Sequence, residues 1–336
     1  MKKIEISNNK SFIKKIFIKI CRIFGFEIID QATFKSPTLG KDLNETLSVP
    51  GKKSIKISLG RLDIKRKVRS IKILLRTCTA ELIMDQNKRR LFDREKNEYT
   101  LRTLKSLIRS IQHAKKEFGN VQFELVITDT NSEEKDIVKM KQLLEVSNLN
   151  HRLLIVDLKN FENKIKTGYS KAKFSNMANF YNSLLIAKNE ENDLIYFVED
   201  DYIHSLNTIT EMIYAYEKFC TLFDKEIILL PSDYPYLYTK DENTKIYLGE
   251  KNHWRLVSES LVTFMTSKTL ILENFNKLER MGIEWIDPWE KPLHEVYNAH
   301  PCFSPIPSLA YHCANVNSVF GVSPNIDLKK LWDENN

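Results

Sequence analysis

Four short apolar runs alternate with amphipathic stretches through the middle of the chain. The runs are rich in β-branched and aromatic residues, as strands buried on both faces are. They cover residues 71–75, 123–128, 153–158 and 194–198, and helical periodicity covers residues 95–118, 133–146 and 176–188. Repeated alternation of strand and helix predicts an α/β domain with a mostly parallel sheet flanked by helices.

Polar and acidic residues follow these predicted strands. The first run leads into Arg76 and Thr77, the second into Asp129, and the fourth into Glu199, Asp200 and Asp201. Ligands of parallel α/β sheets bind beyond the C-terminal ends of the strands. We therefore expect the functional site at this edge.

Residues 11–26 have a different, basic and amphipathic pattern. On a helical wheel the cations gather on one side, opposite the isoleucines and phenylalanines, with only Ile18 breaking the pattern. This is typical of a helix lying on an anionic membrane surface. A helix packed on its own domain, with a solvated basic face, explains the same wheel.

Turn-forming and polar residues fill positions 30–60, which predicts a linker. We place a basic N-terminal segment at residues 1–65 and the main domain at 66–336. The main domain divides into two halves, residues 66–205 and residues 206–336.

The net charge of +7 is unevenly placed. Residues 1–70 hold 17 Lys+Arg against 6 Asp+Glu, or +11, which leaves −4 for the rest. A nucleic-acid-binding protein would carry its basic patch on the folded domain, so no nucleic-acid partner is expected.

No apolar run is long enough to span a membrane, and lysines interrupt the apolar stretch that a signal peptide would need. The five scattered cysteines predict reduced thiols. We expect a cytoplasmic protein, peripheral on the inner face of the membrane.

Three consecutive carboxylates directly after a buried strand are costly, because like charges resist desolvation together. A bound divalent cation removes that cost, and oxygen ligands favour Mg²⁺ or Mn²⁺. A solvated turn is the alternative explanation.

At this point the residues resemble a known family. An apolar strand ending in Glu199-Asp200-Asp201, after two strand-turn units and a helix, is similar to the DXD-type motif of GT-A (Rossmann-like) glycosyltransferases. The layout is most similar to family 2, over roughly residues 70–315.

The resemblance implies a nucleotide-sugar half at residues 66–205, an acceptor half at residues 206–336, and site residues for the donor and the metal. Thr77 and Asp129 would contact the nucleotide. Asn176 would face the diphosphate as the asparagine of their common Arg-Asn pair. Ser175 stands where those enzymes carry the arginine, so Lys173 would supply the charge instead. Asp200 would meet ribose or a metal-bound water. Asp201 and His312 would bind Mn²⁺ or Mg²⁺.

The acceptor half is rich in aromatic residues, whose faces stack on sugar rings, although a plain aromatic core is the simpler reading of each one. An inverting transfer also needs a carboxylate to take the acceptor proton. Asp287 and Glu290 are the candidates, with Glu259 behind them. Asp287 followed by Pro288 equally suggests the first turn of a helix.

Together these patterns predict a metal-dependent glycosyltransferase. It would move a sugar, with inversion, from a nucleotide-diphosphate sugar to a glycan or glycolipid acceptor, in capsule or lipopolysaccharide synthesis. A sugar nucleotidyltransferase is one alternative, although it would normally carry glycines after the first strand. A non-catalytic glycan-binding domain is the other.

Overall fold

The computed structural model describes residues 12–26, 43–45, 54–55, 62–80, 90–239, 244–314, 319 and 326–336. The chain divides into two compact units, residues 1–63 and 64–336. None of the helices in the described part is long and apolar enough to cross a membrane.

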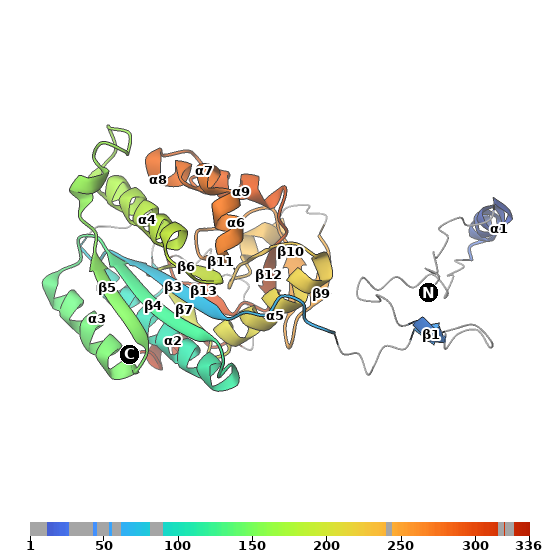
Figure 1. Ribbon diagram of the computed structural model, residues 1–336, viewed down its shortest axis with the longest axis horizontal. Helices are drawn as coiled ribbons and strands as arrows, with labels where there is room; N and C mark the ends of the chain where they lie inside the picture. Colours follow the sequence, from blue (N-terminus) through green and yellow to red (C-terminus); the bar gives the residue numbers. More distant parts are fainter. Residues whose placement is uncertain are drawn as a thin grey trace. The chain divides into compact units, whose positions relative to one another are not determined.

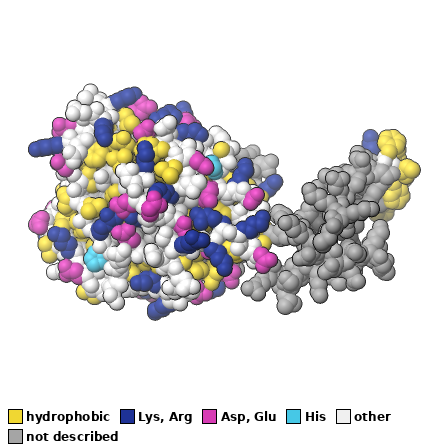
Figure 2. Space-filling view, in the orientation of Figure 1, with side chains coloured by type: hydrophobic (Ala, Val, Ile, Leu, Met, Phe, Trp, Pro, Cys, Tyr) yellow, Lys and Arg dark blue, Asp and Glu magenta, His cyan; other side chains and the backbone are white. Residues whose placement is uncertain are grey.

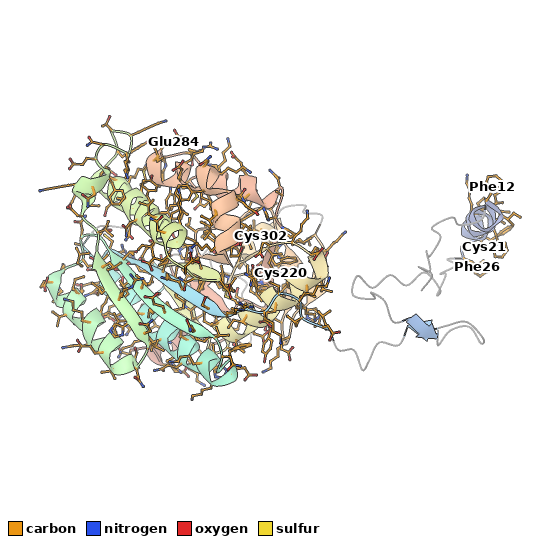
Figure 3. The ribbon with its side chains drawn as sticks, viewed as in Figure 1. Phe12, Cys21, Phe26, Cys220, Glu284 and Cys302 are labelled. Atoms are coloured by element: carbon orange, nitrogen blue, oxygen red, sulfur yellow. The ribbon has the colours of Figure 1, made fainter. Side chains whose placement is uncertain are left out.

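The N-terminal unit contains helix α1 (Phe12–Ile23) and a two-stranded antiparallel sheet of β1 (Leu43–Glu45) and β2 (Ser54–Ile55). The apolar side chains of α1 are exposed (Figures 2 and 3). Phe12 and Ile23 are each 77% exposed, and Phe17 is 57% exposed. Helix α1 therefore presents an apolar face.

A nine-stranded sheet forms the centre of the main unit (Figure 1). Its order is β5-β4-β3-β6-β11-β8-β12-β10-β9, and only β10 and β11 run opposite to the others. The strands are β3 (Ser70–Thr77), β4 (Gln122–Asp129), β5 (Asn150–Ile155), β6 (Leu194–Glu199), β8 (Ile228–Leu229), β9 (Ile246–Leu248), β10 (His253–Leu256), β11 (Phe264–Ser267) and β12 (Cys302–Ile306). The predicted halves, residues 66–205 and 206–336, share this one sheet.

Helices cover both faces of the sheet (Figure 1). One face packs on α2 (Lys96–Glu117), α3 (Glu134–Ser147) and α5 (Thr208–Phe223). The other packs on α4 (Lys171–Asn189), α6 (Lys268–Glu273), α7 (Phe275–Leu278), α8 (Arg280–Ile283) and α9 (Lys291–Tyr297). Along β3, Ile71 and Ile73 enter the first core and Leu74 the second. The predicted α/β architecture, a mostly parallel sheet flanked by helices, is confirmed.

Two differences from the expected boundaries have local causes. The third strand ends at Ile155, because Asp157 accepts a hydrogen bond from the Lys159 amide and starts a 3₁₀ helix, η2 (Leu158–Phe161). Helix α4 begins five residues earlier than expected, because the Ser170 hydroxyl accepts from the Lys173 amide as an N-cap.

A small antiparallel sheet of β7 (Tyr202–His204) and β13 (Ala310–His312) lies beside the main one. Its register sets His312 opposite Tyr202, the residue after Asp201. A short C-terminal helix, α10 (Leu328–Asp333), packs through Trp332 on Tyr99 of α2. A second 3₁₀ helix, η3, spans Pro235–Thr239. All five cysteines are free thiols, and Cys220 and Cys302 are buried in the main unit (Figure 3).

Candidate active site

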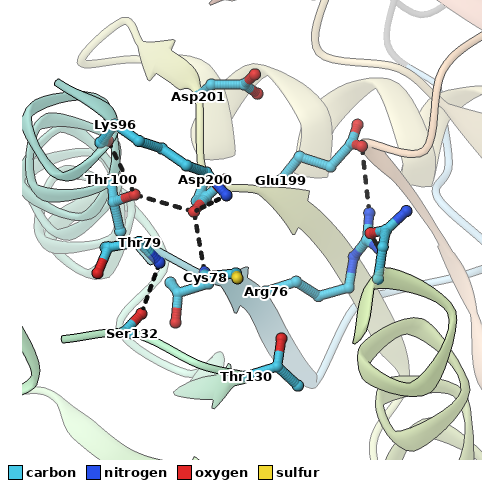
Figure 4. Close-up of polar contacts among 12 residues, drawn as sticks. Arg76, Cys78, Thr79, Lys96, Thr100, Thr130, Ser132, Glu199, Asp200 and Asp201 are labelled. Atoms are coloured by element: carbon cyan, nitrogen blue, oxygen red, sulfur yellow. Dashed lines mark hydrogen bonds and ion pairs between the residues drawn. The ribbon is translucent and has the colours of Figure 1, made fainter. Parts of the chain in front are cut away.

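The C-terminal ends of β3, β4 and β6 bring the predicted polar residues side by side (Figure 4). The parallel register sets Thr77 opposite Asp129, and Arg76 opposite Glu199. Asp200 and Asp201 follow directly as β6 leaves the sheet. The expected edge therefore gathers several carboxylates around one buried arginine.

Asp200 faces the first turns of α2 and the loop after β3. One carboxylate oxygen accepts a hydrogen bond from the Thr100 hydroxyl at 2.9 Å and from the Cys78 amide at 3.2 Å (Figure 4). The Lys96 ammonium lies 3.8 Å from the same oxygen. Asp200 therefore ties β6 to β3 and α2 through this one oxygen.

Asp201 points away from these contacts and pairs with His312. The distance from Asp201 Oδ2 to His312 Nε2 is 3.2 Å, and each side chain is 13% exposed. The β7–β13 register causes this contact across 111 positions, and the His312 ring also stacks on Tyr202 at 4.6 Å. Burial alone would lower the pKa of His312 and raise that of Asp201. Their mutual attraction reverses both, so the pKa of His312 is raised and that of Asp201 is lowered.

Arg76 is the buried cation of the site. Its guanidinium donates to the Asn176 side-chain oxygen at 3.1 Å, and Nη2 lies 3.3 Å from a carboxylate oxygen of Glu199. Burial lowers the pKa of Arg76, while Glu199 opposes that change. Burial raises the pKa of Glu199, and Arg76 opposes that change. The ring faces of Phe180 and Trp289 lie under the guanidinium, at 5.4 and 5.7 Å.

Of the two leading candidates for the base, the structure brings Glu290 to this group. Burial, together with the charge of Glu199, raises the pKa of Glu290 to about 7, while His312 and Arg76 act in the opposite sense. Asp287 is exposed at the surface. Helix α9 begins at Lys291 with Glu290 as its N-cap residue, so the expected helix start at Asp287 and Pro288 is wrong.

Thr77 and Asp129 face one another in the interior. The Thr77 hydroxyl donates to Asp129 Oδ2 at 2.6 Å, and the Ser132 amide and hydroxyl donate to the same carboxylate. Burial raises the pKa of Asp129, although these hydrogen bonds oppose it. Asp129 is only 1% exposed, so its carboxylate orders the loops after β3 and β4.

Helix α4 supplies three further contacts at this edge. The Asn179 amide donates to the carbonyls of Thr128 at 2.8 Å and of Thr77 at 3.3 Å, which fixes the strand ends. Ser175, at the position where the resemblance leads us to expect an arginine, is buried and accepts a hydrogen bond from the Asn131 side-chain amide. Lys173 lies over the Trp285 ring, 4.4 Å from its centroid.

The aromatic residues of the second half serve largely as core. Trp254 and Tyr234 are buried, and Tyr247 packs on Phe303. Beside these aromatic residues, Arg255 and Asp233 form an ion pair at 2.9 Å. Ser258 lines a separate pocket of about 560 Å³ near the start of β12.

The residues present can hold a divalent cation only with help from other ligands. Asp201 Oδ1 and His312 Nδ1 are buried and accept or donate no hydrogen bond within the described part of the chain. A separation of 3.2 Å suits two adjacent ligands of an octahedral ion, which lie about 3 Å apart. No group of three or more His, Cys, Asp or Glu among the described residues is placed to hold a metal. An ion on Asp201 and His312 therefore requires oxygens of substrate and water.

Comparison by sequence finds no match, either to a protein-family model or to a curated protein. Several solved structures are similar at very low identity. S. aureus TarS is similar over 78% of this chain and 41% of that one, with TM-score 0.44 and 10% identity. The bifunctional glycosyltransferase WbbM is similar over 70% and 38%, with TM-score 0.38 and 10% identity. UDP-glucose pyrophosphorylase, solved with UDP-glucose, is similar over 75% and 95%, with TM-score 0.37 and 7% identity. The chain thus spans about two-fifths of the length of TarS and of WbbM.

The sequence places Arg76 at the expected edge but does not show that it is buried against Glu199. Thr100, which contacts Asp200, escapes the sequence reasoning, because it is one polar residue near the start of a predicted helix. No local pattern in the sequence reveals the contact between Arg76 and Asn176. The two residues lie 100 positions apart, and their contact depends on how α4 packs on the sheet.

Proposed function

We propose that this protein is a metal-dependent glycosyltransferase that acts, with inversion, on a nucleotide-diphosphate sugar and a glycan or glycolipid acceptor. The observation that carries the proposal is the Asp201–His312 pair, whose remaining buried atoms lack hydrogen-bond partners, in electrostatic contact with Glu290. Metal ligands and a base of raised pKa are the two parts that this chemistry requires.

The donor would lie across the ends of β3, β4 and β6. Asp200 lies on the nucleotide side, and the buried Thr77–Asp129 hydrogen bond orders the loops that receive the nucleotide. Asn176 and Lys173, in the first turns of α4, face the diphosphate. A helix N-terminus adds a favourable field for that anion. Mn²⁺ or Mg²⁺, held by Asp201 and His312, would neutralise charge on the departing diphosphate.

Glu290 supplies the proton acceptor. The acceptor hydroxyl gives its proton to the Glu290 carboxylate while its oxygen forms a bond to the anomeric carbon of the donor. The bond from that carbon to the diphosphate breaks, and the nucleoside diphosphate leaves with the electron pair. A base with a pKa of about 7 is ionised for part of the population at neutral pH, as efficient proton transfer requires.

Thermal unfolding of the full chain with UDP, GDP, CMP and dTDP, each with and without Mn²⁺, tests the donor site. A ligand at 100 times its dissociation constant adds about 2.7 kcal/mol to the free energy of unfolding. We expect one nucleotide to raise the midpoint only with metal, and Asp201→Asn to lose the rise. Asp224→Asn, an exposed aspartate at the end of α5, is the matched control and should keep it.

Assays of the product separate the alternatives. Transfer from a nucleotide-diphosphate sugar supports the proposal. Release of pyrophosphate from a nucleoside triphosphate and a sugar 1-phosphate identifies a nucleotidyltransferase instead. Glycan binding without nucleotide binding identifies a non-catalytic domain.

Helix α1 supports action at an anionic membrane surface, on the cytoplasmic face. Ile13 in α1, and Phe24 and Phe26 directly after it, are 76%, 73% and 68% exposed, and four cations lie between Ile13 and Phe24 in the sequence. Apolar insertion and cations each favour binding to an anionic bilayer, at about 1 kcal/mol per cation near its surface.

Cosedimentation with vesicles tests this surface. The full chain should cosediment with phosphatidylglycerol vesicles and should not cosediment with phosphatidylcholine vesicles. Phe17→Glu should lose the binding, while Val146→Glu, at an exposed apolar position of α3, should keep it. Equal binding by both variants would refute a role for α1.

A further inference from the structure

Two tryptophan rings stack in the segment between α8 and α9. The centroids of Trp285 and Trp289 are 5.5 Å apart and their planes differ by 4°. Trp289 is buried, and its indole N–H donates to the Met281 carbonyl at 2.8 Å. Trp285 is partly exposed. Trp285 is therefore the outer member of a stack whose inner member is fixed in the core.

The Lys173 ammonium lies over this outer ring, 4.4 Å from its centroid. Lys173 belongs to the first turn of α4, and it forms no ion pair with the residues that the structure describes. A cation–π contact at a partly exposed ring is weaker than a charge-assisted hydrogen bond to phosphate. An anion at the start of α4 would therefore draw Lys173 off the ring.

We propose that Trp285 is the platform for the acceptor's sugar ring and that Lys173 covers it until the donor binds. This inference rests on the proposed function. The Lys173 ammonium leaves the Trp285 ring because it binds the donor diphosphate. The ring is then free to stack on a pyranose. Trp285 stacks on Trp289, the residue before Glu290, so the platform and the base belong to one segment of the chain. Donor then binds before acceptor.

The chain makes this movement measurable, because its four tryptophans differ in exposure. Trp254, Trp289 and Trp332 are at most 6% exposed, so acrylamide quenching of tryptophan fluorescence reports mainly on Trp285. We expect the effective nucleoside diphosphate, added as UDP, GDP or dTDP with Mn²⁺, to raise the quenching constant of the full chain about twofold. Trp285→Phe should remove that rise.

Two lysine variants give the matched comparison. Lys173→Ala should show the raised quenching constant without any nucleotide. Adding the nucleoside diphosphate with Mn²⁺ should not raise that constant further. Lys171→Ala, two residues away on the exposed side of the same turn, should behave as the unmodified chain does. A rise in Lys173→Ala as large as in the unmodified chain would overturn the role of Lys173.

The outcomes separate this inference from the function on which it rests. If no nucleotide shifts the unfolding midpoint, both fail. If one shifts the midpoint and leaves quenching unchanged, only the cover on Trp285 is refuted. UDP-glucose, or the matching sugar conjugate, distinguishes the occupant. If the quenching constant with the sugar conjugate equals that with the nucleoside diphosphate, the Trp285 ring is free for the acceptor sugar. If the constant with the sugar conjugate is lower, the donor sugar covers the ring, and the acceptor assignment is overturned.

Discussion

Replacing Glu290 with glutamine should stabilise the main unit above neutral pH while it abolishes sugar transfer. Burial, with the charge of Glu199, raises the pKa of Glu290 from 4.5 to about 7. Between these two pH values the folded chain keeps a proton that the unfolded chain has lost. The free energy of unfolding therefore falls as pH rises through this window.

The size of the effect follows from the shift. Each pKa unit corresponds to about 1.4 kcal/mol, so the carboxylate costs the folded state about 3 kcal/mol above pH 7. Glutamine is neutral at every pH and does not bear that cost. At about 2 °C per kcal/mol for a unit of this size, the midpoint of the variant should rise by roughly 6 °C at pH 8.

Thermal unfolding at pH 5 and pH 8, in EDTA, measures this difference. The variant and the unmodified chain should differ little at pH 5 and by the full amount at pH 8. Asp287→Asn is the matched control, because the Asp287 side chain is exposed and its replacement should leave both midpoints unchanged. In parallel, transfer activity of the unmodified chain should rise with pH through about 7, and Glu290→Gln should lose at least about a hundredfold.

Either of two results would refute the reasoning. A midpoint difference that is the same at both pH values would show that the Glu290 carboxylate is not destabilised by its surroundings. Transfer activity within tenfold of the unmodified chain would show that another group takes the acceptor proton.

Three stability predictions follow from other contacts. Asp129→Ala should lower the free energy of unfolding by about 2 kcal/mol, because it leaves buried hydroxyl donors without an acceptor; urea unfolding checks this. Arg76→Met should cost about 3 kcal/mol in the same assay, because it removes the cation beside Glu199. Gly282→Ala should cost about 1–3 kcal/mol, because an added Cβ would lie 2.5 Å from Tyr181 Cβ; Gly119→Ala, with open space around it, should cost far less.

Local sequence patterns were enough for most of the elements around the site. Strands β3, β4 and β6 and helices α2 and α3 agree with the predicted ranges within about two residues. Their apolar residues repeat with a period that the sequence shows directly, and β-branched runs buried on both faces have few other structures to adopt. The polar strand ends were visible for the same reason.

The sequence also singled out Asp201 and His312 through the family resemblance, but their contact depends on the fold. It requires β13 to pair with β7 in a register that sets His312 opposite Tyr202. Short strands of three residues have little periodicity, so no sequence window reveals that pairing. The choice between Asp287 and Glu290 also depends on the fold, because the packing of the α8–α9 segment leaves Asp287 exposed and covers Glu290 in part.

The sequence by itself thus determined the alternating elements, the edge of the sheet where polar side chains gather and the amphipathic pattern of α1, because these follow from the order of apolar and polar residues. Only the tertiary structure decided which charges meet. Arg76 beside Glu199, Lys173 over Trp285 and the raised pKa of Glu290 all depend on burial and on distances between residues far apart in the chain, and electrostatic energies change steeply with both.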